Sequence, residues 1–218
     1  MPHTKYISQM KKILFTAALS AASLFTFAQA PTFGIKGGVN FAKINASASL
    51  GGTSVSVSTG TLTSFSAGVF ADFNIGSQVS IQPAVSFTGK GGKETDTNGD
   101  QAQINLYYVQ VPVNVVYHIP AWETGSFYFG AGPYIGVGVS GKNKVTSGGT
   151  TVSQDIEFGS DEGQFKSTDF GVNGILGFQF TNGFLLGVNY DLGLSNIANS
   201  SDASVKNRVF GISAGFKF

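Results

Sequence analysis

Apolar residues alternate with small or polar residues along most of the chain after residue 31. The last ten residues, VFGISAGFKF, show this most clearly, because every even position is apolar and the odd positions after Val209 are glycine, serine or lysine. A period of two residues is typical of a β-strand whose two faces meet different surroundings. The pattern recurs in eight segments and predicts eight strands, at residues 32–44, 64–75, 79–90, 104–119, 126–141, 167–181, 183–196 and 207–218.

The connections between these segments alternate in length. Short connections follow the second, fourth and sixth segments, and the last of these contains Asn182 in a T-N-G sequence that favours a hairpin turn. Long connections follow the first, third, fifth and seventh segments. Transmembrane barrels have short turns on the periplasmic side and long loops outside. The sequence therefore predicts an all-β fold, an eight-stranded antiparallel up-and-down transmembrane β-barrel formed by residues 29–218.

The two faces of the predicted strands favour a membrane barrel over a soluble one. One face carries large apolar side chains and no charge, and the other carries small and polar side chains. If the apolar face pointed inward, it would have to fit a lumen that eight strands leave barely wide enough for ordinary side chains. Only 11% of the residues are charged, whereas soluble domains have roughly 25%. We therefore expect the apolar face to meet lipid.

Aromatic residues on the apolar face fall near the strand ends, eight to ten residues apart within a strand. At a rise of about 3.3 Å per residue and a tilt near 40°, this separation spans roughly 20–25 Å, close to the apolar band of an outer-membrane barrel. We therefore expect two membrane-interface girdles. The girdle near the short turns contains Phe33, Phe73, Tyr117, Phe180, Phe184 and Phe218, and the girdle near the long loops contains Phe41, Phe65, Phe87, Tyr107 and Phe170.

Four charged residues fall on the polar, lumen-facing side of strands that become neighbours when the barrel closes. They are Lys36, Asp72, Asp191 and Lys217. Because an unpaired charge in a narrow lumen is costly, we expect opposite charges to pair there, bracing the wall and obstructing flow. The alternative is a set of independent hydrated charges.

The N-terminus has the pattern of a secretory signal peptide. Lys11 and Lys12 precede the apolar stretch ILFTAALSAASLFTF, and small residues follow it in TFAQAP. We expect residues 1–28 to be removed, with Met10 as the natural start. Removal takes away three lysines and leaves 10 basic and 12 acidic residues. This balance does not suggest a nucleic-acid partner, which would need a clustered basic surface.

Several stretches resemble the PorT-like outer membrane β-barrel family, whose members are often called porin family proteins. They are FGIKGGVNFAKI, YYVQVPVNVVYHI, FYFGAGPYIGVGVSGK and FGVNGILGFQFTNGFLLGVNYDLGLSNI, and they are followed by a terminal aromatic residue. The resemblance implies an eight-stranded barrel in the outer membrane of a Gram-negative cell. It also implies that Phe218 marks the last strand for the barrel-assembly machinery. The family fixes no reaction.

The residues offer little for catalysis or metal binding. The chain has no cysteine, and His118 is the only histidine after the signal peptide. A Ser-His-acid hydrolase site would have to use His118, which could equally lie at the membrane interface near Trp122. The loop acids Asp155, Glu157, Asp161 and Glu162 could bind calcium, but they lack the EF-hand spacing. A solvated loop explains them better, and we expect no cofactor and no metal.

The sequence therefore predicts a monomeric, non-enzymatic barrel without a periplasmic domain, either porin-like or a structural barrel that acts at the cell surface. The alternatives are a subunit of an outer-membrane protein export complex and a lipid-acting barrel enzyme. The long loops at 53–64 and 144–158 alternate apolar or β-branched residues with small polar ones. These loops could extend two hairpins above the membrane and bind an extracellular partner by edge pairing. The alternative is a pair of ordinary mobile loops.

Overall fold

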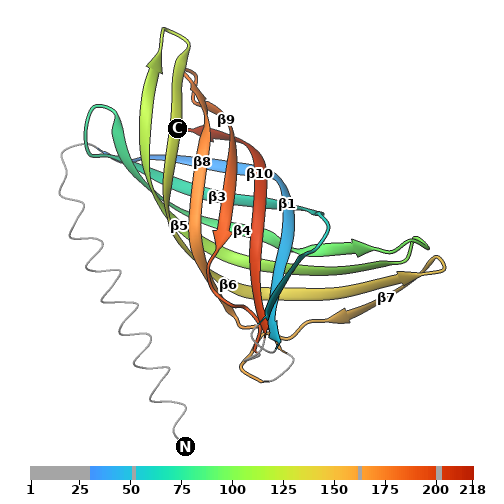
Figure 1. Cartoon of the computed structure of the whole chain (residues 1–218). Coiled ribbons are helices and arrows are strands. Elements are labelled where there is room, and N and C mark those ends of the chain that lie inside the picture. Colours follow the sequence, from blue (N-terminus) through green and yellow to red (C-terminus); the bar gives the residue numbers. More distant parts are fainter. Residues whose placement is uncertain (1–29, 51–52, 162–163, 200–202) are drawn as a thin grey trace, which may run out of the picture. The chain divides into compact units, whose positions relative to one another are not determined.

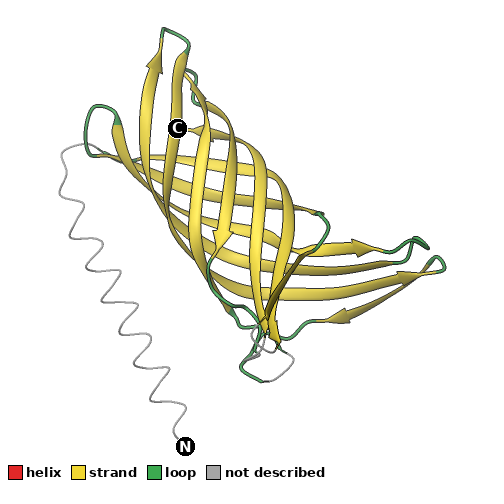
Figure 2. Cartoon of the chain, in the orientation of Figure 1, coloured by secondary structure: helices red, strands yellow, loops and turns green. Residues whose placement is uncertain are grey.

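The computed structural model describes residues 30–50, 53–161, 164–199 and 203–218. The predicted signal peptide lies outside the described residues. The part of the chain that is described forms β-strands joined by turns and loops (Figures 1 and 2). None of its segments is a helix long and apolar enough to cross a membrane.

The strands are antiparallel and follow the chain in order. Their bounds are β1 Thr32–Leu50, β2 Thr53–Ser58, β3 Leu62–Asn74, β4 Val79–Thr95, β5 Gln101–Ala121, β6 Gly125–Ser147, β7 Thr150–Asp155, β8 Thr168–Phe180, β9 Phe184–Gly193 and β10 Ala203–Lys217.

Eight of these strands form a closed ring. Each of β1, β3, β4, β5, β6, β8, β9 and β10 pairs with the next, and β10 pairs with β1 from Gly34↔Lys217 to Ala48↔Ala203. The Phe218 N–H extends this seam by donating to the Phe33 carbonyl at 2.8 Å. Closure leaves no open edge in the ring, which is how barrels avoid uncontrolled strand pairing. The predicted eight-stranded antiparallel barrel is therefore confirmed.

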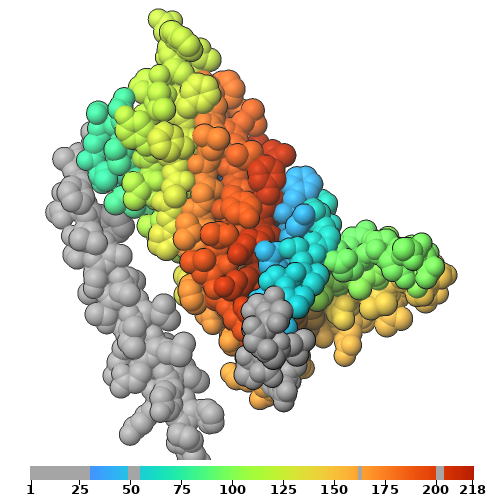
Figure 3. Space-filling model, in the orientation of Figure 1, coloured from blue at the N-terminus to red at the C-terminus, as the bar shows by residue number. Residues whose placement is uncertain are grey.

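Two strands lie off the ring and confirm the predicted hairpin extensions. β2 pairs with the outer end of β1, and β7 pairs with the outer end of β6. The ring strands β4, β5 and β6 also run several residues beyond their predicted ends. Residues 92–95, 101–105, 142–147 and 150–155 of β4 to β7 together form a four-stranded outer sheet. Figure 3 shows its hairpin tips, in green and yellow, projecting away from the barrel wall.

Side-chain burial follows the predicted alternation. Val115 is 56% exposed, whereas its chain neighbour Val116 is 0% exposed, because adjacent residues of a strand point to opposite sides of the wall. The exposed positions form an apolar outer surface that includes Phe33, Val69, Ile135, Leu176 and Ile212. Water would disfavour such a continuous apolar surface, and hydrocarbon would not.

Two apolar clusters fill the lumen at different levels. The cluster nearer the short turns contains Phe70, Val116, Tyr128, Ile175 and Leu185. Gly177 and Gly187 leave room for the Tyr128 ring, because a Cβ atom at either glycine would overlap the Tyr128 hydroxyl. The cluster nearer the long loops is built on Leu106, Tyr108 and Ile197, with partly buried side chains such as Phe158 packed against it. The barrel core is therefore a filled interior with polar residues between and around two apolar layers.

The turn predicted at Asn182 is confirmed. Asn182 Oδ1 accepts a hydrogen bond from the Phe184 N–H at 3.0 Å, and Gly183 has a φ of 89°. This φ lies in the region that glycine enters without steric cost. The turn places β8 beside β9 in the register Gln179↔Leu185.

Candidate functional site in the barrel lumen

A buried ion pair crosses the lumen near the long loops. Lys90 on β4 lies 2.9 Å from Asp169 Oδ2 on β8, and both side chains are 0% exposed. The Asp169 carboxylate also accepts hydrogen bonds from Ser195 Oγ at 2.9 Å and from Asn207 Nδ2 at 3.0 Å. Tyr134 Oη also donates a hydrogen bond to Asp169 Oδ2, at 3.4 Å. Both charges are thus neutralised within the protein, as buried charges require.

Aromatic rings surround the Lys90 ammonium group. Its Nζ lies 4.2 Å from the ring centroid of Tyr134 and 5.2 Å from that of Tyr108. Both distances fall within the range in which a ring face attracts a cation. The ion pair and its rings close the lumen at this level, next to the apolar cluster around Tyr108.

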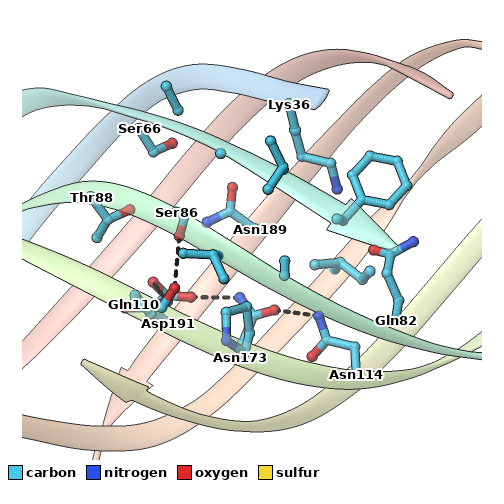
Figure 4. A pocket seen from close by; sticks show the side chains of 18 residues that line it. Lys36, Ser66, Gln82, Ser86, Thr88, Gln110, Asn114, Asn173, Asn189 and Asp191 are labelled. Carbon is cyan, nitrogen blue, oxygen red and sulfur yellow. Dashed lines mark hydrogen bonds between the residues drawn. The ribbon is translucent and has the colours of Figure 1, made fainter. Parts of the chain in front are cut away.

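A polar cavity of about 80 Å³ lies deeper in the lumen (Figure 4). Asp191 accepts hydrogen bonds there from Gln110 Nε2 at 3.0 Å and from Asn173 Nδ2 at 2.5 Å. Asn173 in turn accepts one from Asn114 Nδ2 at 2.7 Å. Gln110 Oε1 and Asn114 Oδ1 have no hydrogen-bond partner among the described residues. A cavity of this size has room for several water molecules, which such unpaired acceptors would hold.

Lys36 also lines this cavity, but it forms no ion pair within 4.0 Å among the described residues. Its Nζ instead lies 5.5 Å from the Phe70 ring centroid and 5.7 Å from that of Tyr128. Lys36 therefore sits where the polar cavity meets the first apolar cluster. Lys36 and Asp191 line the same cavity, but they do not form an ion pair.

A second ion pair lies at the short-turn end of the lumen. Lys217 Nζ donates to Asp72 Oδ2 at 2.6 Å, and the Asp72 side chain is almost fully buried. Of the four lumen charges expected from the sequence, the structure thus joins Asp72 and Lys217 directly. The carboxylate of Asp191 is instead held by amides. The role of these residues in bracing the barrel stays a prediction.

His118 lies beside this pair. Its Nε2 is 3.2 Å from Ser80 Oγ and 4.0 Å from Asp72 Oδ2. A hydrolase triad needs the serine on one ring nitrogen and the acid on the other. Here both contacts involve the same nitrogen, and Ser80 is completely buried inside the lumen. The three residues therefore lack the geometry of a triad.

The loop acids considered for calcium do not converge. Asp155 pairs with Lys142 at 2.9 Å, and Glu157 accepts a hydrogen bond from Gln164 at 3.3 Å. Glu162 lies outside the described residues. Within the described part of the chain, no three His, Cys, Asp or Glu side chains gather as a metal site would require.

The predicted girdle aromatics form contacts at both ends of the outer surface. At the long-loop end, Phe65, Phe87 and Tyr107 contact one another with ring centroids 5.4–6.1 Å apart, and Phe41 stacks on Phe210 at 6.3 Å. At the short-turn end, Phe180 contacts Phe184 at 6.0 Å and Phe216 contacts Phe218 at 5.6 Å. Phe33 and Phe170 are exposed on the same outer surface. Their place at the membrane interface stays a prediction, as it does for Phe73 and Tyr117.

Removing the Lys217 ammonium group is expected to destabilise the barrel. A Lys217→Met variant leaves the buried Asp72 carboxylate without its closest partner, which should cost about 1–3 kcal/mol. Asp72→Asn should cost less, because asparagine still offers Lys217 an oxygen acceptor. Urea unfolding in lipid vesicles, followed through Trp122 fluorescence, would measure both. Equal stability of wild type and Lys217→Met would show that the pair does not brace the wall.

The comparison with protein families agrees with the fold. The family model of the outer membrane protein beta-barrel domain matches residues 27–199. No curated relative matches the sequence. Among solved structures, Neisserial surface protein A is 18% identical, with 87% of this chain and 98% of that chain covered and a TM-score of 0.44. OprG from Pseudomonas aeruginosa is 14% identical, with coverages of 87% and 97% and a TM-score of 0.45.

A third solved structure is that of Ail from Yersinia pestis in complex with the heparin analogue sucrose octasulfate. It is 16% identical to this chain, with coverages of 84% and 99% and a TM-score of 0.35. At these values the likeness says nothing about ligands or partners.

Proposed function

Since the chain belongs to the family of the outer membrane protein beta-barrel domain and is a barrel of the Gram-negative outer membrane, we propose that it is a closed, non-enzymatic barrel that acts through its extracellular strands. The filled lumen carries this proposal. The Lys90–Asp169 pair and two apolar clusters occupy successive levels of the interior. A continuous path for solutes would need these side chains to be absent or displaced.

The outer sheet is the part of the barrel best placed to meet a partner. Its strands are held together at the tips, because Asp100 accepts hydrogen bonds from Ser147 Oγ at 2.8 Å and from the Gly148 N–H at 3.3 Å. β7 pairs with β6 on one side, and no described strand pairs with its other edge. Val152 is exposed on this edge strand. An extended segment of an extracellular partner could add to β7 through main-chain hydrogen bonds.

Four finer points belong to the same proposal. Residues 1–28 act as an export signal, the barrel works as a monomer, and it is a member of the PorT-like family. Phe218 identifies the closing strand to the barrel-assembly machinery. Its side chain is exposed at the end of β10, which supports recognition from outside the barrel.

A narrow porin is the second candidate function. The polar cavity beside Asp191 favours it, because this part of the interior is polar and has room for water. Both apolar clusters would then have to part during conduction. Single-channel recording separates the two functions.

Single-channel recording in planar lipid bilayers tests the proposal. The refolded mature chain is expected to give no discrete conductance steps, because side chains close its lumen at several levels. Folding is checked in parallel by the difference in migration between unheated and heated samples on a denaturing gel. Reproducible steps from a preparation that is folded by this criterion would instead establish a porin.

A further inference from the structure

Three basic residues gather on the outer surface where β1 meets β10, next to the long-loop girdle. Lys43 pairs in register with Arg208, and Lys206 lies two residues before Arg208 on the same face of β10, opposite Asn45. We call Lys43, Lys206 and Arg208 the basic patch. It begins two residues beyond the register pair Phe41↔Phe210, whose rings stack. Figure 1 shows β1 and β10 side by side along this seam.

The alternation of burial places the basic patch on the lipid-facing side of the wall. Ala42 and Ile44 flank Lys43 and are buried, while Lys43 itself is exposed. Asn207 and Val209 flank Arg208 and are each 1% exposed. Lys43, Lys206 and Arg208 therefore continue the surface formed by Phe41 and Phe210.

The charge of the basic patch is not neutralised within the described part of the chain. No ion pair within 4.0 Å involves any of its three residues. Arg208 donates hydrogen bonds to the carbonyls of Gly193 and Asn207, which carry no net charge. Two like charges directly opposite each other across a strand pair are destabilising. The Lys43↔Arg208 pair is therefore a place where an external anion would relieve repulsion.

The position of the patch along the strands indicates which anion this is. Aromatic girdles lie at the boundary between hydrocarbon and headgroups. At about 3.3 Å per residue and a tilt near 40°, Lys43 and Arg208 lie roughly 5 Å beyond that boundary. This is the level of the lipid headgroups. Lysine and arginine bind phosphate through charge-assisted hydrogen bonds, and basic clusters beside a membrane attract anionic lipids.

We propose that the basic patch binds the phosphate groups of lipids in the outer leaflet. Charge complementarity and continuity with the lipid-facing surface favour a lipid over a soluble protein at this place. Binding would fix the depth of the β1–β10 seam in the membrane. This proposal depends on the barrel lying in the outer membrane and not on whether its lumen conducts.

Titration of the folded full-length barrel in neutral detergent with diphosphorylated lipid A tests the proposal. The Lys43→Gln/Lys206→Gln variant is expected to bind roughly 30-fold more weakly, because each basic residue near a membrane surface contributes about fivefold in affinity. Arg208 is left in place because its guanidinium group also holds two backbone carbonyls. The Lys144→Gln/Lys166→Gln variant carries the same charge change outside the patch and should lose less than about threefold.

Two further titrations identify the ligand. Dephosphorylated lipid A should bind wild type and the Lys43→Gln/Lys206→Gln variant equally weakly. Millimolar inorganic phosphate should not displace the phosphorylated lipid. The proposal is overturned if the patch variant binds like wild type, if the control variant loses as much, or if inorganic phosphate competes fully. Full competition would assign the patch to free phosphate.

Discussion

Replacing Asp169 with asparagine is expected to lower the free energy of unfolding by about 3–5 kcal/mol. The Lys90 ammonium group is completely buried, and Asp169 is its counter-ion at 2.9 Å. Asparagine can still accept hydrogen bonds from Ser195 and Asn207, so the change mainly removes the negative charge. Breaking a buried pair on one side leaves an uncompensated charge, which is the costly case. Urea unfolding in vesicles, followed by Trp122 fluorescence and gel migration, measures the loss.

An exposed pair in the same chain provides the control. Lys142 and Asp155 also lie 2.9 Å apart, but their side chains are 50% and 81% exposed. Asp155→Asn should therefore change stability by about 1 kcal/mol or less, because water solvates both charges. A Lys90→Met/Asp169→Asn double variant should be more stable than Asp169→Asn alone, since no unpaired charge remains. If Asp155→Asn and Asp169→Asn cost the same, burial of the Lys90–Asp169 pair does not matter for stability.

The sequence missed this ion pair for a topological reason. Lys90 is an even number of residues from Gln82 and Ser86, which face the lumen. Asp169 is likewise an even number of residues from the lumen-facing Asn173. Alternation alone could thus have placed both residues inside. Their strands are not neighbours, however, because β5 and β6 separate β4 from β8. Pairing across the lumen depends on the depth of each residue and on the barrel's stagger, which a single sequence does not provide.

Contacts along the wall were easier to predict than contacts across it. Asp72 and Lys217 lie on strands separated only by β1, and closure of the ring brings them to one end. Asp191 also faced inward as expected, but its partners are the amides of Gln110 and Asn173. Charge alone did not reveal these partners, because a neutral amide can satisfy a buried carboxylate.

The fold itself was largely determined by alternation and turn spacing. The valines at 109, 111, 113 and 115 are exposed while Gln110 and Asn114 are buried, as the period of two requires. The extra length of β4 and β5 was missed because charged and polar residues such as Lys93 and Gln103 interrupt the apolar pattern there. These strand ends belong to the outer sheet, which has no need of a continuous apolar face if it stands in water.

A lysine at position 113 is expected to destabilise the membrane-embedded barrel by about 2–4 kcal/mol. Val113 is exposed in the middle of β5, between the two predicted girdle residues Tyr107 and Tyr117. A lysine ammonium group is costly in hydrocarbon but is well solvated in water. The stability of this variant therefore shows whether lipid or water surrounds Val113. Urea unfolding in vesicles would measure the difference from wild type.

Val152→Lys is the matched control, because Val152 is also an exposed valine on a strand but belongs to the outer sheet. There the lysine ammonium group would stay in water, and stability should change by no more than about 0.5 kcal/mol. A small effect at both positions would mean that water, and not lipid, covers Val113. A large effect at Val113 alone would show that the apolar surface lies in hydrocarbon and that the outer sheet stands clear of it. The outer sheet would then be free to meet partners outside the cell, as the proposed function requires.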